Sequence, residues 1–381
     1  MPKSSSIRIA AITGCRSDFG LVQPIIQALG SFSTAEVLLF VTGNHTLRRF
    51  GSTINQVKKS FSITGIWDVF PEVSTPENLA VSLGKLGAAS AKDFSKHKPD
   101  ALLIVGDRTE MLPPAQSAAI LGIPIAHVGG GETTKGAIDE NIRGCLTSLS
   151  KWHFVSLPSF RNKVRRMGIE SENIFITGET ALDTLLSQPD ATSDELRDFL
   201  GFCPDENTLV LVYHPETLST DLGLKGLRET LSVLDSWPGK IVVTYPNSDA
   251  GSDFIISELE RFCRNSSKRK VIPSLGSKNW TALLKRAGAI IGNSSSAIIE
   301  APSFKLPGVN IGSRQSGRYK PKNVVDAAPF RSDIKEALAR ATSKNFRESL
   351  KKLKNPYGDG KSGRRIAEIL LKVLSGERLE Q

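Results

Sequence analysis

The feature that most constrains the fold is a repeated alternation of short apolar runs with segments of helical periodicity. The apolar runs fall at residues 7–13, 37–42, 101–105, 209–213, 241–245, 289–291 and 309–311. Unbroken apolar runs of this length are typical of strands buried on both faces, and intervening helices imply parallel sheets. Two series of runs in 381 residues therefore predict two doubly wound, Rossmann-like α/β domains.

We place the first domain at residues 1–178 and the second at residues 179–362. The last helical pattern, within residues 363–376, follows the turn-rich stretch NPYGDGKSG and is predicted to join the first domain. The loop after the first strand reads GCRSDFG, with a helix expected from residue 21. It lacks the GxGxxG spacing, so a dinucleotide-binding fingerprint is absent.

Net charge and hydropathy limit the partners and the cellular location that we expect for this protein. The net charge is +10, which suggests nucleic acid as a partner. However, the basic residues are scattered and no aromatic-basic RNA platform is present, so we expect no nucleic-acid partner. No apolar run approaches the roughly 20 residues that span a bilayer, and no signal-peptide pattern precedes the first strand. We expect a cytoplasmic protein without a membrane partner, whose four cysteines are reduced thiols.

Polar side chains gather where the predicted strands end. They are Arg16, His45, Asp107, Arg108, His214, Asn247, Ser294 and Ser295. Ligands of open α/β sheets bind outside the carboxyl ends of the strands. Two such domains facing each other would bring these side chains into one cleft.

Residues 125–144 read IAHVGGGETTKGAIDENIRG, which predicts a buried strand, a glycine loop and a helix bearing acids and an arginine. Glycine loops are places where the backbone approaches a ligand, although a tight loop before a solvated acidic helix start is the alternative. Asp107 and Asp139 are candidate acid/base groups. Asp139 and Arg143 have i, i+4 spacing and are placed to pair, as they would in an ordinary helix salt bridge.

The stretch GNSSS, residues 292–296, precedes a short helix and is a candidate phosphate cradle. A serine helix cap is the alternative. The nearby Arg314 and Arg318 favour a diphosphate, because arginine binds phosphate with two hydrogen bonds. His214 is a candidate hydrogen-bond donor to a phosphate, with a structural histidine as the alternative. No metal-ligand spacing is visible, so metal-independent chemistry without a cofactor is expected.

These motifs carry a resemblance to a known family. They are GCRSDFG, TGNH, GDRTE, GGETTKGAIDENIR, HPET, PNSDAG, IIGNSSSAIIEAPSF and VNIGSRQSGR. Together they resemble the hydrolysing UDP-N-acetylglucosamine 2-epimerases of sialic-acid-type sugar biosynthesis, over nearly the whole chain. The form GAIDENIR is similar to the hydrolysing branch rather than the non-hydrolysing one.

The resemblance implies a glycosyltransferase-B-like fold, UDP bound in the interdomain cleft, and a homodimer or homotetramer. It implies anti elimination of UDP to a glycal, followed by addition of water to give a sugar inverted at C2. The first domain would hold the sugar and the second the nucleotide. By position, the residues that would bind the nucleotide or its phosphates are Arg16, Arg108, His214, Asn247, Ser294, Ser295, Glu300 (at the ribose) and Arg318, and those that would line the sugar pocket are Asp107, Asp139 and Arg143. Together with the residue types at the strand ends and in the glycine loop, this gives as candidate catalytic residues Asp107, Glu132, Asp139, Arg143 and His214, and adds His45 and Arg314 to the candidate binding residues.

Two positions depart from the family pattern as we understand it. Gly129 stands where the family usually has Glu or His, and Gly144 stands where the hydrolysing branch usually has His. Either Glu132 and Asp139 move the protons, or the reaction differs, or the space admits a larger sugar such as a 2,4-diacetamido-trideoxy hexose. A glycosyltransferase and a non-catalytic UDP-sugar binder are the alternative functions.

Overall fold

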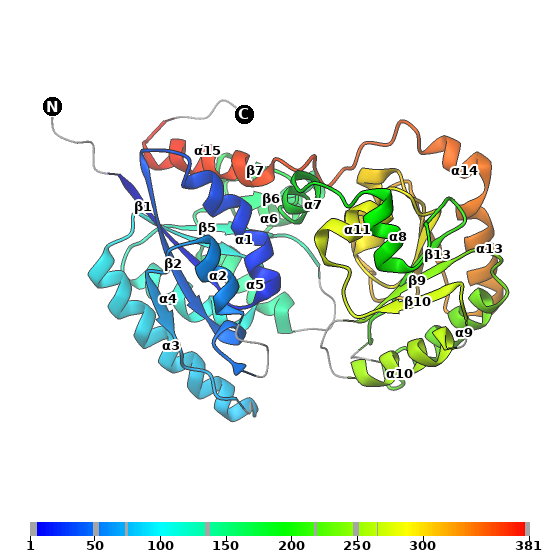
Figure 1. Cartoon of the computed structure of the whole chain (residues 1–381). Coiled ribbons are helices and arrows are strands. Elements are labelled where there is room, and N and C mark those ends of the chain that lie inside the picture. Colours follow the sequence, from blue (N-terminus) through cyan, green and yellow to red (C-terminus); the bar gives the residue numbers. More distant parts are fainter. Residues whose placement is uncertain are drawn as a thin grey trace. The chain divides into compact units, whose positions relative to one another are not determined.

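The computed structural model describes residues 6–48, 53–72, 75–133, 138–216, 219–246, 251–264 and 266–377. The chain divides into two compact units: unit 1 comprises Met1–Thr184 and Tyr357–Gln381, and unit 2 comprises Leu185–Pro356. Each unit is a parallel sheet covered by helices (Figure 1), so the expected pair of doubly wound α/β folds is confirmed. The division falls inside helix α7 (Ala181–Ser187), a few residues after residue 178.

The sheet of unit 1 has seven strands in the order β3-β2-β1-β4-β5-β6-β7. The strands are β1 (Ile7–Thr13), β2 (Ala35–Thr42), β3 (Gly65–Trp67), β4 (Ala101–Val105), β5 (Ile125–Val128), β6 (Trp152–Val155) and β7 (Ile174–Ile176). Every pairing is parallel, and the register is set by pairs such as Ile7 with Ala35 and Ile9 with Ala101. The carboxyl ends of all seven strands therefore lie along one edge of the sheet.

The remaining helices of unit 1 are α1 (Arg16–Leu29), α2 (Ile54–Ser60), α3 (Pro76–His97), α4 (Leu112–Ile120), α5 (Ile138–Leu149), α6 (Pro158–Arg166) and α15 (Ser362–Leu374). Helix α3 shows how the sequence sets the ends. Thr75 caps its first turn by accepting the Asn78 backbone N–H at 3.1 Å, and Pro76 occupies a position that needs no N–H. The helix stops where Lys98 turns to a left-handed φ of 47°.

One local expectation is wrong. The stretch GCRSDFG is not a loop throughout, because α1 begins at Arg16 and carries Asp18 in its first turn; an acid is favoured there by the helix dipole. The buried strand expected at the start of residues 125–144 is present. Ile120 ends α4, a turn follows at Gly122 with φ of 72°, and Ile125–Val128 form β5.

Alternate residues of each central strand fill two separate cores. In β1, Ile9 and Ala11 belong to one cluster, whereas Ala10 and Ile12 belong to the cluster on the opposite face. All four are essentially inaccessible to solvent. Burial on both faces is why these strands read as unbroken apolar runs rather than as an alternating pattern.

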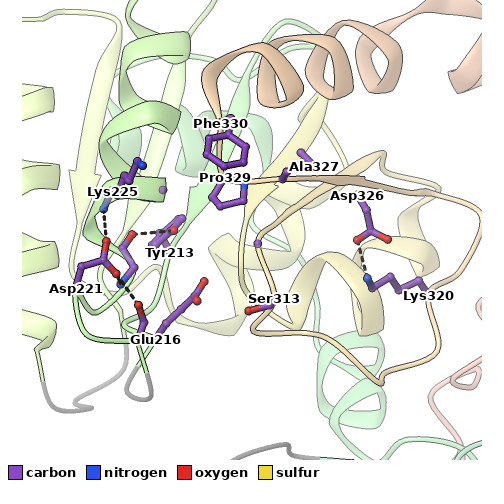
Figure 2. A pocket seen from close by; sticks show the side chains of 15 residues that line it. Tyr213, Glu216, Asp221, Lys225, Ser313, Lys320, Asp326, Ala327, Pro329 and Phe330 are labelled. Carbon is purple, nitrogen blue, oxygen red and sulfur yellow. Dashed lines mark hydrogen bonds and ion pairs between the residues drawn. The ribbon is translucent and has the colours of Figure 1, made fainter.

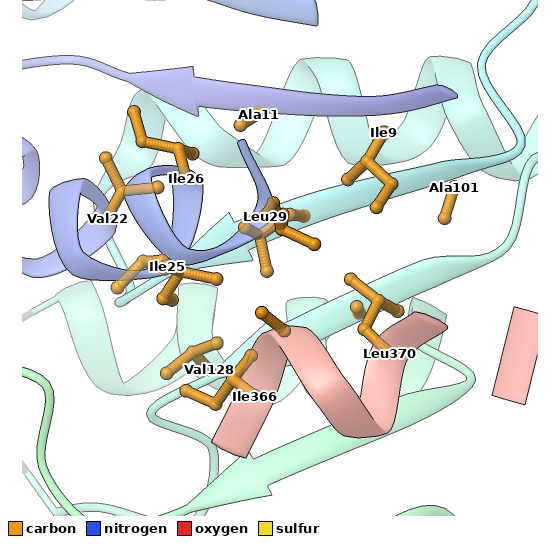
Figure 3. Close-up of a cluster of buried hydrophobic side chains, with 14 of the residues drawn as sticks. Ile9, Ala11, Val22, Ile25, Ile26, Leu29, Ala101, Val128, Ile366 and Leu370 are labelled. Atoms are coloured by element: carbon orange, nitrogen blue, oxygen red, sulfur yellow. The ribbon is translucent and has the colours of Figure 1, made fainter. Parts of the chain in front are cut away.

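The C-terminal helix α15 belongs to the core of unit 1. Ile366 and Leu370 are fully buried in the cluster that contains Leu29 of α1 and Ile9 of β1 (Figure 3). The start of α15 is held by Asp183, whose carboxylate accepts the backbone N–H groups of Ser362 at 2.9 Å and Gly363 at 2.6 Å. The apolar face of this helix thus completes a sheet made almost 200 residues earlier.

The sheet of unit 2 has six parallel strands in the order β10-β9-β8-β11-β12-β13. They are β8 (Leu209–Val212), β9 (Ile241–Thr244), β10 (Arg269–Ile272), β11 (Ala289–Gly292), β12 (Gly308–Ile311) and β13 (Val324–Ala327). The same division of strand residues between two faces recurs here, with Leu209 and Leu211 in one core and Val210 and Val212 in the other.

The helices of unit 2 are α8 (Ser193–Leu200), α9 (Leu224–Asp235), α10 (Ser252–Cys263), α11 (Gly276–Leu284), α12 (Ser296–Ile299), α13 (Arg331–Thr342) and α14 (Lys344–Ser349). Helix α8 begins with a capping box, in which Thr192 and Glu195 each bind the other's backbone N–H. It ends at Gly201, whose φ of 83° is left-handed.

Both sheets reverse their strand order at one place. In unit 1 the chain moves outward from β1 to β3 and then crosses to β4, and in unit 2 it moves from β8 to β10 and then crosses to β11. The loops after the two central strands diverge at such a point and leave a crevice where ligands bind. The structure therefore directs attention to the residues after β1 and β4, and to those after β8 and β11.

Candidate active site

An ion-pair cluster lies at the strand-order reversal of unit 1, where β1 and β4 end. Arg108, which follows β4, donates from Nε to Glu110 Oε1 at 2.7 Å and lies 3.5 Å from Asp18 Oδ2. Asp18 and Glu110 are buried, at 6% and 7% exposure. Burial raises the pKa of Asp18 to about 7, and the charge of Arg108 opposes this rise. Arg108 is thus held by two acids, while Arg16 beside them is exposed.

Glycines of two motifs make room for Glu110. A Cβ on Gly14 would lie 2.7 Å from Glu110 Oε1, and a Cβ on Gly43 would lie 2.6 Å from the Gly14 carbonyl oxygen. Gly43 also has a left-handed φ of 61°. Gly14 of GCRSDFG and Gly43 of TGNH therefore permit close packing around Glu110, the carboxylate that binds Arg108.

His45 has a protein partner on each ring nitrogen. Its Nε2 lies 2.9 Å from Thr13 Oγ1 and its Nδ1 lies 2.7 Å from Thr53 Oγ1. The residue is fully buried, and burial lowers its pKa to about 4. In this structure His45 joins the end of β1 to the start of α2. A role in substrate binding stays a prediction.

A second charged cluster lies where β4 and β5 meet α5 and α6. Arg143 of α5 forms an ion pair through Nη2 with Asp107 Oδ2, and its Nη1 lies 3.0 Å from Glu140 Oε2. The same Nη1 donates to the carbonyl oxygen of Glu132 at 3.0 Å. Arg143 is buried, with a side chain only 7% exposed. The cluster brings three of the predicted residues together: Asp107, Arg143 and the backbone of Glu132.

The expected pairing of Asp139 with Arg143 is wrong among the residues that the structure describes. The acid that binds Arg143 from its own helix is Glu140, at i, i+3. Asp139 is half-buried in the first turn of α5. Arg143 reaches back along α5 toward the end of β4, which is why its strongest partner is Asp107 rather than the residue one turn before it.

The glycine loop after β5 owes its shape to two left-handed residues, Gly129 with φ of 92° and Gly131 with φ of 78°. A Cβ on Gly131 would lie 2.6 Å from the carbonyl oxygen of Phe160, so only glycine fits there. A Cβ on Gly129 would touch the Gly106 backbone at 3.7 Å, whereas one on Gly144 would meet no described atom within 4 Å. Of the two departures from the family pattern, Gly144 is therefore the one that leaves open space among the described residues.

His127 at the end of β5 is a structural residue. It is fully buried, and its Nε2 donates to the Gly106 carbonyl at 2.8 Å, because a carbonyl can only accept. Its Nδ1 then accepts from Thr147 Oγ1 at 3.5 Å. Burial lowers the pKa of His127 to about 3. The neutral ring therefore ties β5 to β4 and to α5.

In unit 2 the strand-order reversal is closed by hydrogen bonds rather than ion pairs. Asn293 after β11 is fully buried, and its side chain accepts the His214 backbone N–H at 2.7 Å and donates to the His214 carbonyl at 2.9 Å. Gly292 allows this approach, because a Cβ there would lie 1.9 Å from the Val212 carbonyl oxygen. Burial lowers the pKa of His214 to about 4, and Arg314 acts in the same sense. His214 is therefore neutral at neutral pH.

The predicted phosphate cradle surrounds the carbonyl of Asn293. That carbonyl accepts from Arg314 Nη1 at 3.3 Å and from Gln315 Nε2 at 2.9 Å. Ser294 is buried, and its hydroxyl accepts from Ser296 at 2.9 Å. Arg314 is exposed and Arg318 is half-buried. The loop after β12 thus supplies cations beside the loop after β11.

Ser295 and Glu300 flank the short helix α12. Ser295 occupies the N-cap position without a side-chain cap bond. Glu300 Oε2 accepts from Trp280 Nε1 at 2.6 Å, and burial raises the pKa of this carboxyl. Its orientation is therefore set by an indole from α11. Asn247, the remaining predicted binding residue, lies outside the described residues.

A cavity of about 570 Å³ opens at the same edge of the unit 2 sheet, beside these loops (Figure 2). Its wall includes Tyr213 and Glu216 from the end of β8, and Asp326 and Phe330 from the end of β13. Burial raises the pKa of Glu216, while a hydrogen bond from Asn293 and the charge of Arg314 oppose the rise. The predicted phosphate-binding residues do not line this cavity.

Several residues of these clusters were not identified from the sequence. They are Asp18, Glu110, Glu140, Lys163, Glu216, Asn293 and Gln315. Most of them stand within the motifs quoted above, so their proximity to the predicted residues was a usable signal. Lys163 lies in α6, away from any motif, and only the tertiary structure brings it to the site.

Among the described residues, no group of three or more His, Cys, Asp or Glu side chains is placed to hold a metal ion. No helix in this part of the chain has the length and apolarity needed to cross a bilayer. Metal-independent chemistry stays a prediction.

One known family matches most of this chain. The family described as UDP-N-acetylglucosamine 2-epimerase matches residues 27–371. The chain is 32% identical over 364 residues to a UDP-N,N'-diacetylbacillosamine 2-epimerase (hydrolyzing) of Legionella pneumophila, covering 95% of each chain. It is 32% identical over 347 residues to a GDP/UDP-N,N'-diacetylbacillosamine 2-epimerase (hydrolyzing) of Campylobacter jejuni, covering 91% of this chain and 90% of the relative.

Solved structures share the fold. A Neisseria meningitidis UDP-GlcNAc 2-epimerase bound to UDP-GlcNAc superposes with a TM-score of 0.79 at 19% identity, covering 96% of this chain and all of the other. The matches extend across both units, and all of the quoted motifs except GCRSDFG fall within the residues that the family matches. The chain belongs to the UDP-N-acetylglucosamine 2-epimerase family.

Proposed function

We propose that the protein is a hydrolysing 2-epimerase of a UDP-linked 2-acetamido sugar, releasing UDP and a free sugar inverted at C2. The observation that carries the proposal is the buried Arg143, which binds Asp107 and the Glu132 carbonyl at the carboxyl edge of the unit 1 sheet. This cluster supports the proposal because it gathers two acidic residues and a cation, and the proposed reaction needs acid and base groups. The name of the Legionella pneumophila relative, at 32% identity, supports the same chemistry.

The reaction has two steps. A carboxylate base removes the proton from C2, the electron pair forms the C1–C2 double bond, and the C1–O bond breaks with its electron pair leaving on UDP. The glycal then accepts a proton at C2 on the opposite face and water at C1, which loses a proton to give the free sugar. Positioned carboxyls supply such proton transfers, and the charge that develops on the leaving diphosphate requires cations.

We assign the first proton transfer to Glu132 and the second to Asp107 or Asp139. Arg143 keeps Asp107 in place and balances its charge. In unit 2, Arg314 and Arg318 bind the diphosphate together with the hydroxyls of Ser294 and Ser295. Glu300 uses Oε2 for Trp280 and offers Oε1 to a ribose hydroxyl.

The nucleotide's other contacts fall to Arg16, Arg108, His214 and Asn247. A neutral His214 acts by donating a ring N–H to phosphate rather than by carrying a charge, because its pKa lies near 4.

The sugar we favour carries acetamido groups at C2 and C4. Neither Gly129 nor Gly144 carries the polar side chain that the family usually has there, and the relatives at 32% identity are named for the diacetylated sugar. UDP-GlcNAc is the second candidate. The two differ by the groups at C4 and C6, which a wider pocket would accommodate.

The test is incubation of the purified chain with each UDP-sugar in deuterated water. We expect UDP release and one deuterium at C2 of the product, seen by NMR, with UDP-N,N'-diacetylbacillosamine turned over faster than UDP-GlcNAc. UDP release that needs an acceptor and leaves C2 undeuterated would instead identify a glycosyltransferase. Calorimetric binding without turnover would identify a UDP-sugar-binding protein.

The assignment of Glu132 has its own test. Glu132→Gln keeps the shape of the side chain and the backbone carbonyl but removes the base. We expect turnover to be abolished while UDP affinity, measured by calorimetry, stays nearly unchanged. Turnover at the unmodified rate would reassign the first proton transfer to Asp139.

Cytoplasmic location and assembly into a homodimer or homotetramer are parts of the same proposal. Cell fractionation tests the first. Light scattering of the full chain across a range of protein concentrations tests the second, with a single monomeric mass as the contrary result.

A further inference from the structure

The carbonyl oxygen of Glu132 is bound by two cations at once. Arg143 Nη1 donates to it at 3.0 Å and Lys163 Nζ donates to it at 2.9 Å. Arg143 comes from α5 and Lys163 from α6, so the two donors approach from different elements. A peptide plane held from both sides fixes the direction in which the Glu132 side chain leaves the loop.

Lys163 uses its whole hydrogen-bonding capacity at this point. An ammonium group has three donors. One reaches the Glu132 carbonyl, the second reaches Thr133 Oγ1 at 3.0 Å, and the third reaches Glu140 Oε1 at 2.9 Å. A lysine that only solubilised the surface would not find three acceptors, because ordering its long side chain costs entropy.

Glu140 closes the arrangement into a ring. Its Oε1 binds Lys163 and its Oε2 binds Arg143 at 3.0 Å, so one carboxylate joins both cations. Arg143 continues the chain of charges to Asp107. Two cations and two carboxylates sum to zero charge, although the side chains are only 7% to 40% exposed.

We infer that Lys163 is a positioning residue for the proton-transfer groups: it orients Glu132 through its carbonyl, and it holds Arg143 against Asp107 through Glu140. This inference rests on the proposed epimerase function and extends it. Lys163 acts through Glu132 and Glu140, which it binds. Its removal leaves Glu140 with one cation, the Glu132 carbonyl with one donor, and the cluster with a net negative charge next to Asp107.

The variant Lys163→Met keeps the length of the side chain and loses the charge and all three donors. We expect kcat to fall about 10- to 100-fold, because small displacements of catalytic groups have effects of this size, while KM and UDP affinity change less than about threefold. Lys163→Arg keeps the charge and should recover most of the loss. Arg165→Met, an exposed position of the same helix, is the matched control and should leave kcat unchanged.

A second measurement does not depend on turnover. Amide hydrogen exchange of the full chain without substrate should be faster across residues 129–146 in Lys163→Met than in Arg165→Met, and equal elsewhere. Wild-type-like kcat in Lys163→Met, or a lower kcat without faster exchange in this segment, overturns the inference. If the wild-type chain turns over neither UDP-sugar, the proposed function fails, and the exchange result alone decides whether Lys163 holds this loop.

Discussion

The two units have different kinds of polar contact at the place where the strand order of the sheet reverses. Each sheet reverses its strand order once, and each leaves polar groups at the reversal. In unit 1 these are charged side chains that pair with one another, as Arg108 does with Glu110, and the neighbouring cluster adds the pair of Arg143 with Asp107. In unit 2 they are an amide bound to backbone, as Asn293 is to His214.

This difference predicts proton transfer as the role of unit 1 and ligand binding as the role of unit 2. Ion pairs respond to charge and to pH, and they are suited to proton transfer. Amide and hydroxyl contacts respond to shape, and they are suited to holding a ligand whose charge they do not alter. Unit 1 should therefore be sensitive to lost charges, and unit 2 to lost hydrogen bonds.

The largest expected effect is that of Arg143→Met in unit 1. It leaves Asp107 and Glu140 without their shared buried cation, which should lower the free energy of unfolding of this unit by about 3–5 kcal/mol and abolish turnover. Urea unfolding and the deuterium assay measure the two effects. Arg197→Met, which removes an exposed arginine paired with Asp194, should cost less than about 1 kcal/mol.

The corresponding change in unit 2 is Asn293→Ala. It removes both hydrogen bonds to the His214 backbone and leaves buried groups unsatisfied, so unit 2 should lose about 1–3 kcal/mol. UDP affinity should fall with it, measured by calorimetry. Asn345→Ala on the exposed face of α14 is the control. A larger loss here than in Arg143→Met would reverse the comparison.

Acid should destabilise unit 1 before unit 2. Burial lowers the pKa of His45 to about 4, of His127 to about 3 and of His153 to about 4 in unit 1, but lowers the pKa of only His214 in unit 2. A histidine with a lowered folded-state pKa stabilises the protein fully above its unfolded pKa of about 6.5. That contribution is lost as the pH falls towards 4.

Carboxyls whose pKa is raised by burial act in the opposite sense, because the folded state then binds the proton more tightly. They are Asp18 and Asp183 in unit 1, and Glu216 and Glu300 in unit 2. In unit 1, three histidines that lose stabilisation in acid outnumber two carboxyls that gain it. For each histidine in excess, the free energy of unfolding of unit 1 should fall by about 1.4 kcal/mol per pH unit. Hydrogen exchange at pH 7 and pH 5 checks this, and equal loss in both units would contradict it.

The smallest expected effect compares two glycines within helices. Gly144→Ala in α5 meets no atom within 4 Å and should stabilise unit 1 by about 0.5–1 kcal/mol through higher helix propensity. Gly226→Ala in α9 would place a Cβ 2.7 Å from the Tyr213 hydroxyl and should destabilise unit 2. Thermal unfolding of each variant decides between them, and a gain in both would show that Tyr213 can move.

The sequence supports the prediction of the fold better than that of the site. Strands buried on both faces, such as β1 and β8, are recognisable because every residue is apolar. Short strands such as β3 and β10 were missed, because three or four residues with mixed burial give no period. Residue types at strand ends predicted Asp107 and Arg143 as neighbours of the site.

The sequence predicts which residues belong to the site better than it predicts which of them bind each other. The sequence offered Asp139 at i, i+4 as a partner for Arg143, but the guanidinium reaches Asp107 across 36 residues. Lys163 lies in a helix whose sequence has no motif, and its three contacts depend on the packing of α6 against the glycine loop. Such contacts follow from tertiary structure, which local spacing does not encode.

The return of α15 to the core of unit 1 has a consequence for synthesis on the ribosome. Unit 2 is continuous in sequence and can fold as soon as it emerges. Unit 1 is made first, yet it lacks Ile366 and Leu370 until the last segment of the chain is released. The apolar surface of α1 and β1 therefore stays uncovered during the translation of unit 2, and the earliest part of the protein to be made is the last to be finished.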